Sequence, residues 1–261
     1  MYVTTGYEPS AETLRHAEEL ARRLGLPVRQ RGTSTLNQLR RRYGDEPILV
    51  VSSRGARLEA PGKKPLFFHP NTAAFRIKRL MCGDTDTMLA ACQIQPGSRV
   101  LDATLGLGAD AIVFAHAVGA KGRVVGIESE PLIAVLVEDG LRTWQSDLEA
   151  LNEAMRRVEV RCGNHVEVLA GLPDRSFDVV YFDPMFERAV ESSAGIAGLR
   201  GFANPSTLQE AAVEEALRVA GKRVVMKEAK EGRLYARFGF TPIRTRTQRV
   251  LYSYKETGGG E

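Results

Sequence analysis

The apolar run Val179-Val180-Tyr181-Phe182 is followed directly by the tetrapeptide Asp183-Pro184-Met185-Phe186. The residue types of this tetrapeptide could bind an amine. The carboxyl ends of parallel strands open onto the ligand crevice of an α/β sheet, so we expect Asp183 to face a bound ligand. Proline fixes the turn and lacks an N–H, which leaves the Pro184 carbonyl as a second acceptor. Two acceptors can hold the two hydrogens of an amino group, and Phe186 can stack on the ring that carries it.

An amino group attached to a purine ring is a poor nucleophile because its lone pair is delocalised. Two acceptors that hold its hydrogens pull the nitrogen towards a tetrahedral geometry, and a carboxylate stabilises the positive charge that develops on it. We therefore interpret Asp183, Pro184 and Phe186 as catalytic residues. The alternative is a structural turn with Phe186 in the core.

A glycine-rich turn precedes this tetrapeptide in the chain. A short apolar run ends at Asp102, Gly106 and Gly108 follow, and an apolar helical pattern begins at Ala111. This order predicts strand, tight turn and helix, in which the glycines let the backbone approach a ligand closely. Asp110 stands near the position of the third glycine of a dinucleotide-binding motif, where a carboxylate would repel pyrophosphate and suit a cationic ligand. The alternative is that the glycines only pack the helix against the strand.

Polar residues also follow the next two predicted strands. The apolar run 123–128 ends at Glu128, whose two oxygens can accept hydrogen bonds from both hydroxyls of a ribose. The alternating run 158–163 predicts a third strand, and Asn164 and His165 follow it. Taken alone, His165 is more typical of a surface histidine at the start of a helix.

This combination resembles class I S-adenosylmethionine-dependent methyltransferases, whose cofactor carries a positively charged sulfonium and ammonium group. The resemblance implies a seven-stranded Rossmann-like α/β sheet and S-adenosylmethionine as the cofactor. The cofactor-binding residues that it implies are Asp102, Gly106, Gly108, Ala109 and Asp110 around the methionine end, Glu128 and Ser129 at the ribose, Asn164 and His165 near the adenine, and Asp183 at the transferable methyl group.

The tetrapeptide itself resembles the Asn/Asp-Pro-Pro-Tyr/Phe signature of amino-group methyltransferases, with Met185 in place of the second proline. Together with the glycine-rich turn and Glu128, it resembles the small-subunit rRNA guanine-N2 methyltransferase J family from about Gly83 to Glu228. That resemblance implies methylation of guanine N2 in small-subunit rRNA. The alternatives are a methyltransferase of a small-molecule or protein amine, and a non-catalytic cofactor-binding assembly factor.

A smaller N-terminal α/β module is expected to precede the methyltransferase domain. Ser10 can cap a helix that ends at Gly25, a second helix begins near Leu36, and short strands are predicted at residues 28, 48–52 and 66–69. Residues 71–83 then join the two parts. The predicted organisation is a module over 1–82, a methyltransferase domain over 83–256 and a disordered glycine-rich tail over 257–261.

Positive charge is concentrated in the N-terminal part of the chain. Residues 1–82 contain 15 Lys and Arg against 7 Asp and Glu, a net charge of +8, whereas residues 83–261 contain 21 against 25, a net charge of −4. Arg40, Arg41 and Arg42 form a basic run that we predict to bind RNA, because basic surfaces bind phosphate backbones. The alternative is a helix face that only contacts solvent.

The composition excludes some classes of protein. The three cysteines, Cys82, Cys92 and Cys162, have neither metal-ligand spacing nor an even number, which predicts no metal site and a reducing cytoplasmic environment. No apolar stretch is long enough to span a bilayer, so we expect no membrane association. The sequence gives no indication of the oligomeric state.

Overall fold

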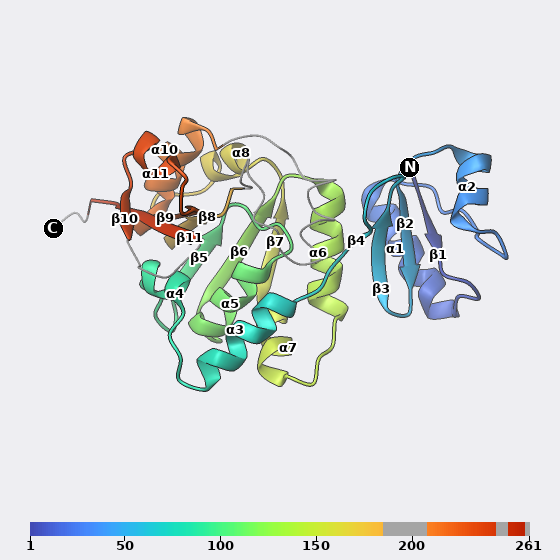
Figure 1. Cartoon of the computed structure of the whole chain (residues 1–261), viewed down its shortest axis with the longest axis horizontal. Helices are drawn as coiled ribbons and strands as arrows, with labels where there is room; N and C mark the ends of the chain where they lie inside the picture. The colour runs from blue at the N-terminus through green and yellow to red at the C-terminus, as the bar shows by residue number, and fades with distance from the viewer. Residues whose placement is uncertain (185–207, 244–249, 259–261) are drawn as a thin grey trace. The chain divides into compact units, whose positions relative to one another are not determined.

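The structure, a computed structural model, describes residues 1–184, 208–243 and 250–258, and it divides into two compact units (Figure 1). The first unit contains Met1–His69 and Pro131–Trp144. The second contains Pro70–Glu130 together with residues 145–184, 208–243 and 250–258. The division predicted after Cys82 stays a prediction, and residues 259–261 of the predicted tail lie outside the described residues.

The first unit is built on a four-stranded sheet in the order β1-β2-β3-β4. Strand β1 pairs with β2 in parallel, and β2, β3 and β4 are successively antiparallel. The bounds of its elements are β1 (Tyr2–Thr5), α1 (Ala11–Leu24), α2 (Leu36–Tyr43), β2 (Ile48–Ser52), β3 (Gly55–Glu59), β4 (Leu66–Phe67) and α6 (Pro131–Thr143). The two predicted helices are confirmed, and the predicted strand at 48–52 is confirmed with the same bounds.

Local capping explains where the N-terminal helices begin and end. The Ser10 side chain accepts a hydrogen bond from the Thr13 N–H, and Gly25 ends α1 in the left-handed conformation. Thr35 and Gln38 form a capping box at the start of α2.

Helix α6 comes from a distant part of the chain and packs against α1 and β3. Where it meets α1, His16 Nε2 lies 2.7 Å from Asp139 Oδ1. The carboxylate of Asp139 raises the pKa of His16, because this hydrogen bond favours the charged imidazolium. The first unit is therefore completed by a helix, Pro131–Thr143, that lies more than 60 residues after His69 in the chain.

The second unit contains a seven-stranded sheet in the order β10-β11-β9-β8-β5-β6-β7. Strands β5 to β9 are parallel to one another, and β11 is antiparallel to both β9 and β10. The strand bounds are β5 (Arg99–Asp102), β6 (Arg123–Glu128), β7 (Val158–Cys162), β8 (Phe177–Phe182), β9 (Ala220–Ala229), β10 (Thr241–Ile243) and β11 (Val250–Glu256). This sheet confirms the predicted Rossmann-like α/β fold.

Helices cover both faces of this sheet. Helix α5 packs against β5, β6 and β7 and contacts α3 and α7, whereas α8 packs against β6 and α10 packs against β8 and β9. The helix bounds are α3 (Asn71–Met81), α4 (Thr87–Ala91), α5 (Ala109–Val118), α7 (Glu149–Arg156), α8 (His165–Ala170), α10 (Glu210–Val219) and α11 (Leu234–Arg237). None of the helices in the described ranges is long and apolar enough to cross a membrane.

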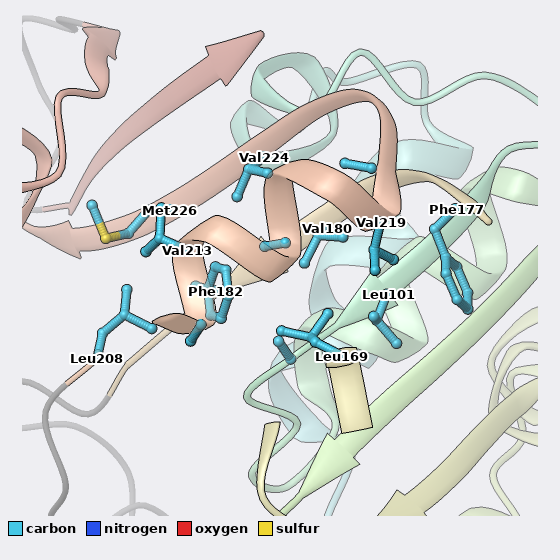
Figure 2. Close-up of a cluster of buried hydrophobic side chains, with 14 of the residues drawn as sticks. Leu101, Leu169, Phe177, Val180, Phe182, Leu208, Val213, Val219, Val224 and Met226 are labelled. Atoms are coloured by element: carbon cyan, nitrogen blue, oxygen red, sulfur yellow. The ribbon is translucent and has the colours of Figure 1, made fainter. Parts of the chain in front are cut away.

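Alternating side chains of the parallel strands form the core beneath α8 and α10. Figure 2 shows Leu101 and Val180 from the central strands in one cluster with Leu169 of α8 and Val213 and Val219 of α10. All of these side chains are buried. Successive residues of a strand point to opposite faces, so the same strands also supply the other face, where Tyr181 packs edge-on against Phe114 of α5.

Gly126 in β6 links the core to the glycine-rich turn. A Cβ atom at this position would overlap the side chain of Leu105, which is buried and whose N–H donates to the Ile127 carbonyl at 2.9 Å. We expect Gly126→Ala to lower the free energy of unfolding by about 1–3 kcal/mol, the usual cost of overpacking a core. Urea denaturation followed by circular dichroism would measure this change.

Gly221→Ala in β9 is the matched control, because its added Cβ meets only ordinary contacts. Equal stability of the two variants would contradict the assigned role of Gly126.

Candidate functional site

The carboxyl ends of neighbouring parallel strands bring most of the predicted site residues to one edge of the sheet. Asp102 ends β5 and Glu128 ends β6, while Asp183 follows β8 directly. Strand β8 pairs with β5, with Asp102 opposite Tyr181, and the Asp183 N–H donates to Thr104 Oγ1 at 2.6 Å. Asp183 is therefore joined by a direct hydrogen bond to Thr104, which leads into the glycine-rich turn.

The glycine-rich turn has the backbone conformation that the sequence predicts. Gly106 and Gly108 have φ angles of 52° and 76°, in the left-handed region that favours glycine, and Gly108 caps the start of α5. The buried carboxylate of Glu128 accepts hydrogen bonds from the N–H groups of Gly106 (3.2 Å) and Glu130 (2.9 Å). Burial raises the pKa of Glu128, and these backbone donors oppose that shift.

Asp110 lies in the first turn of α5 and is already paired within the chain. Its carboxylate contacts the guanidinium of Arg76, accepts a hydrogen bond from Lys227 Nζ at 3.0 Å, and accepts another from the Tyr181 hydroxyl at 2.9 Å. Burial acts to raise the pKa of Asp110, but the charges of Lys227 and Arg76 outweigh it and lower the pKa. Asp110 is therefore ionised and supplies fixed negative charge.

Lys227 joins Asp110 to Asp183. Its Nζ donates to Asp183 Oδ2 at 2.6 Å, and the Asp183 side chain keeps 28% of its surface exposed. Burial raises the pKa of Asp183, Lys227 opposes this shift, and the negative charge of Asp110 adds to it, so the net pKa lies above that of an ordinary aspartate. Asp183 thus presents a partly exposed carboxylate of increased proton affinity.

The sequence pattern did not indicate Lys227, which lies within β9. The pairing of Phe182 with Met226 brings Lys227 beside Asp183 at the strand end. The sequence signal for this position is a lysine directly after the apolar residues 224–226, within a strand that continues to Ala229.

Arg76 is a second residue of the candidate site that the sequence pattern did not indicate, because residues 71–83 were interpreted as a connection. Residues 71–81 form helix α3 instead, with Ala73 and Ile77 buried. The guanidinium of Arg76 makes two hydrogen bonds to Asp86, at 2.7 and 2.9 Å, and Asp86 caps α4 by accepting from the N–H of Met88. Arg76 therefore holds α3 and the start of α4 against Asp110.

Asp102 is the most deeply buried of the predicted site carboxylates, with 1% of its surface exposed. Burial, followed by the negative charge of Asp110, raises the pKa of Asp102 to about 8, although its carboxylate accepts a hydrogen bond from the Thr104 N–H at 3.1 Å. Asp102 is therefore largely protonated at neutral pH in the ligand-free protein.

The residues after β7 lie at the start of α8. The Asn164 side chain caps this helix by accepting from the Val166 N–H at 2.9 Å, and its amide nitrogen can still donate. The ring of His165 lies 6.1 Å from that of Phe182, and its Nε2 is buried without a hydrogen-bond partner among the described residues. Burial lowers the pKa of His165, so its imidazole is neutral.

The remaining predicted site residues have different outcomes. Ser129 follows Glu128 and is half-buried, Ala109 begins α5, and Pro184 is buried. Phe186, predicted to stack on the substrate ring, lies outside the described residues. Within those residues no group of three metal-ligating side chains could hold a metal ion.

The predicted RNA-binding run lies in α2 of the first unit. Arg41 and Arg42 are exposed. Arg40 differs from them: its side chain is only 14% exposed, lies 3.9 Å from Asp45, and has a buried Nε without a hydrogen-bond partner among the described residues. The three arginines are therefore not equivalent.

The chain is similar to known methyltransferases along most of its length. The profile of a family described as putative SAM-dependent methyltransferase matches residues 34–250. The chain is 42% identical over 255 residues to the uncharacterized protein YpiP of Bacillus subtilis, with 98% of this chain and 99% of that protein covered. It is 34% identical over 221 residues to ribosomal RNA small subunit methyltransferase J of Pseudomonas savastanoi, with 82% of this chain and 77% of that protein covered.

A solved structure agrees with these matches. The crystal structure of the SAM-dependent methyltransferase NGO1261 from Neisseria gonorrhoeae aligns with a TM-score of 0.67 at 20% identity, covering 100% of this chain and 98% of that one. At this level of identity the likeness shows the fold alone.

The residues at the strand ends fit S-adenosylmethionine, the cofactor that the family implies. This cofactor carries two positively charged groups and a ribose diol. Glu128 offers carboxylate oxygens beside the backbone of Gly106. At the turn, Asp102 offers a buried carboxyl group and Asp110 offers a negative charge. Gly106 and Gly108 add no side chain there. The donor and acceptor chemistry therefore matches that of the cofactor.

Binding of the cofactor should release a proton from Asp102. A nearby cation favours the ionised carboxylate, so it lowers a pKa that stands at about 8 in the free protein, and the affinity for S-adenosylmethionine should rise as the pH approaches 8 from below. Calorimetry at neutral pH, in buffers with different ionisation enthalpies, would measure the released proton.

In this experiment Asp102→Asn should abolish the release, while Asp174→Asn, at an exposed carboxylate, should preserve it. A binding enthalpy that does not depend on the buffer in the unmodified protein would contradict the role of Asp102.

Proposed function

This chain belongs to the family of putative S-adenosylmethionine-dependent methyltransferases and is a relative of the ribosomal RNA small subunit methyltransferases J, and from that premise we propose that it methylates the exocyclic amine of a base in RNA. The proposed target is guanine N2 of small-subunit ribosomal RNA. The observation that carries the proposal is the strand end at Asp183, where a partly exposed carboxylate stands between Thr104 and Lys227.

We propose that Asp183 binds the amine, rather than acting only as a structural turn. Its backbone is fixed by the bond from its N–H to Thr104, and its carboxylate is oriented by Lys227. The exposed part of the carboxylate can accept one hydrogen of an amino group, and the Pro184 carbonyl is the proposed acceptor of the other. The bound cofactor supplies an activated methyl group on its sulfonium.

The electrostatics of Asp183 suit the charge changes of N-methylation. The amine nitrogen gains positive charge as it is methylated, and a fixed carboxylate stabilises that charge without reorganisation. The methylated nitrogen must then lose one proton. Because burial and Asp110 raise the pKa of Asp183, this carboxylate accepts a proton more readily than an ordinary aspartate does.

RNA is the proposed substrate for two reasons. The relative from Pseudomonas savastanoi is named as a ribosomal RNA methyltransferase, and residues 1–82 of this chain carry a net charge of +8. A small-molecule or protein amine would not require this charge. The site around Asp183 argues against a cofactor-binding assembly factor without activity.

The modified nucleosides of the small-subunit rRNA test the proposal. We expect deletion of the gene to remove one N2-methylguanosine from this rRNA and a plasmid copy of the wild type to restore it. Mass spectrometric mapping of nuclease fragments would locate the nucleotide. An unchanged set of methylated nucleosides in the rRNA, or a change at a position other than an exocyclic amine, would overturn the proposal.

Substitution of Asp183 separates chemistry from binding. Asp183→Asn keeps the shape but removes the negative charge, so we expect the rate of methyl transfer to fall by about 10²- to 10³-fold with little change in RNA affinity. Single-turnover transfer to purified small ribosomal subunits would measure the rate. Asp174→Asn serves as the control at an exposed carboxylate and should retain the wild-type rate; a normal rate for Asp183→Asn would remove its carboxylate from the mechanism.

A further inference from the structure

An extended segment lies along the edge of the sheet of the first unit, next to β1. Val28 forms a parallel bridge with Val3, the Arg29 N–H donates to the Val3 carbonyl at 2.8 Å, and Thr4 Oγ1 donates to the Arg29 carbonyl at 2.7 Å. These bonds fix the backbone of residues 28–29. Arg31 follows two residues later, and the bond from its Nη1 to the Thr5 carbonyl places it beside β1 as well.

Each of these two arginines stacks on a tyrosine. The guanidinium carbon of Arg31 lies 3.8 Å from the centre of the Tyr7 ring, and that of Arg29 lies 4.9 Å from the centre of the Tyr43 ring. Arg42 approaches the ring of Tyr43 as well, at 6.0 Å. We refer to Tyr7, Arg29, Arg31 and Tyr43 as the Arg–Tyr strip.

The side chains of the Arg–Tyr strip are held in place by the protein itself. Arg31 donates from Nε to the Ser34 carbonyl at 3.1 Å and from Nη1 to the Thr5 carbonyl at 3.3 Å. The ring of Tyr43 packs edge-on against Tyr2, with the ring centres 5.7 Å apart. A ligand that binds here therefore meets preordered groups, which reduces the entropy lost on binding.

The tyrosines of the strip remain accessible although arginines stack on them. Tyr7 and Tyr43 are 55% and 39% exposed. The surrounding sequence, residues 25–44, contains five arginines and no aspartate or glutamate. Exposed aromatic rings within a surface of positive charge are the combination that binds single-stranded nucleic acids, since bases stack on the rings and phosphates pair with the cations.

We propose that the Arg–Tyr strip binds an unpaired segment of the RNA substrate. Bases stack on Tyr7 and Tyr43, and Arg29, Arg31 and the exposed Arg42 neutralise the phosphates. This inference rests on the proposed function in one respect only, that the substrate is RNA. The proposed RNA-binding surface thus differs from the run of three arginines in α2 that the sequence predicted. Arg40 of that run is largely buried, whereas the tyrosines of the strip are exposed.

Stacking and charge leave different signatures in binding experiments. Removal of a ring weakens binding at every salt concentration equally, whereas removal of a cation that pairs with a phosphate flattens the dependence of affinity on salt. The probe is a fluorescein-labelled single-stranded RNA of mixed sequence, about 12 nucleotides long, near the site size of such surfaces. Its binding to the full chain would be followed by fluorescence anisotropy at several salt concentrations.

The variants change one property at a time. We expect Tyr7→Leu with Tyr43→Leu to weaken binding by about tenfold or more with an unchanged salt slope. The matched control, Tyr7→Phe with Tyr43→Phe, keeps both rings and should bind as the wild type does. Arg29→Gln with Arg31→Gln should reduce the slope of log K against log salt by about 0.7 for each phosphate that is no longer neutralised. S-adenosylmethionine should bind all three variants with the affinity of the wild type.

Three outcomes would overturn the inference: no binding of the RNA probe by the wild type, wild-type affinity in the leucine variant, or equally strong competition by polyglutamate, which would indicate a general site for acidic chains. The leucine variant is compared only if its circular dichroism spectrum matches that of the phenylalanine variant, and if it does not, Tyr7→Leu alone takes its place. The two proposals can fail separately. If RNA binding depends on the strip but the rRNA of the deletion strain keeps its methylation, this inference is supported and the proposed function is wrong.

Discussion

The interaction on which the candidate site depends is the sharing of one ammonium group between two carboxylates. Lys227 Nζ lies 3.0 Å from Asp110 and 2.6 Å from Asp183. Two carboxylates this close to one cation in a largely buried site would repel each other strongly without it. Because Asp110 belongs to the helix after the glycine-rich turn and Asp183 follows the end of β8, this lysine fixes the proposed cofactor side of the site relative to the proposed substrate side.

The same arrangement gives three neighbouring carboxyl groups different protonation behaviour. Asp110 has two cationic partners and a lowered pKa, Asp183 shares one of them and has a raised pKa, and Asp102 is buried beside negative charge with a pKa of about 8. Identical side chains thus supply a fixed negative charge, an acceptor with increased basicity and a neutral acid. Their environments, rather than their residue type, determine what each can do.

Local rules made some parts of the protein predictable from the sequence. Ser10 and Gly25 marked the ends of α1, and the glycines at 106 and 108 marked the turn, since capping and positive φ angles depend on adjacent residues. Asp183 and Glu128 were recognised because they lie where apolar runs end. Other interactions join residues far apart in the chain: Arg76 meets Asp110 across 34 positions, and the stacking of Arg31 on Tyr7 requires residues 28–29 to lie beside β1. No pattern within either segment indicates such a pairing.

Helix α6 has a consequence for how the first unit is encoded. It follows β6 in the chain, yet it packs on α1 and β3 and contributes Asp139 to a hydrogen bond with His16. Its Gly140 faces Phe68 so closely that no side chain would fit between them. A fragment of residues 1–69 would therefore lack part of its own core, and the unit cannot be excised, fused or exchanged as a contiguous piece of sequence. Any recombination that moved it would have to carry two separate segments, so the two units are expected to be inherited together.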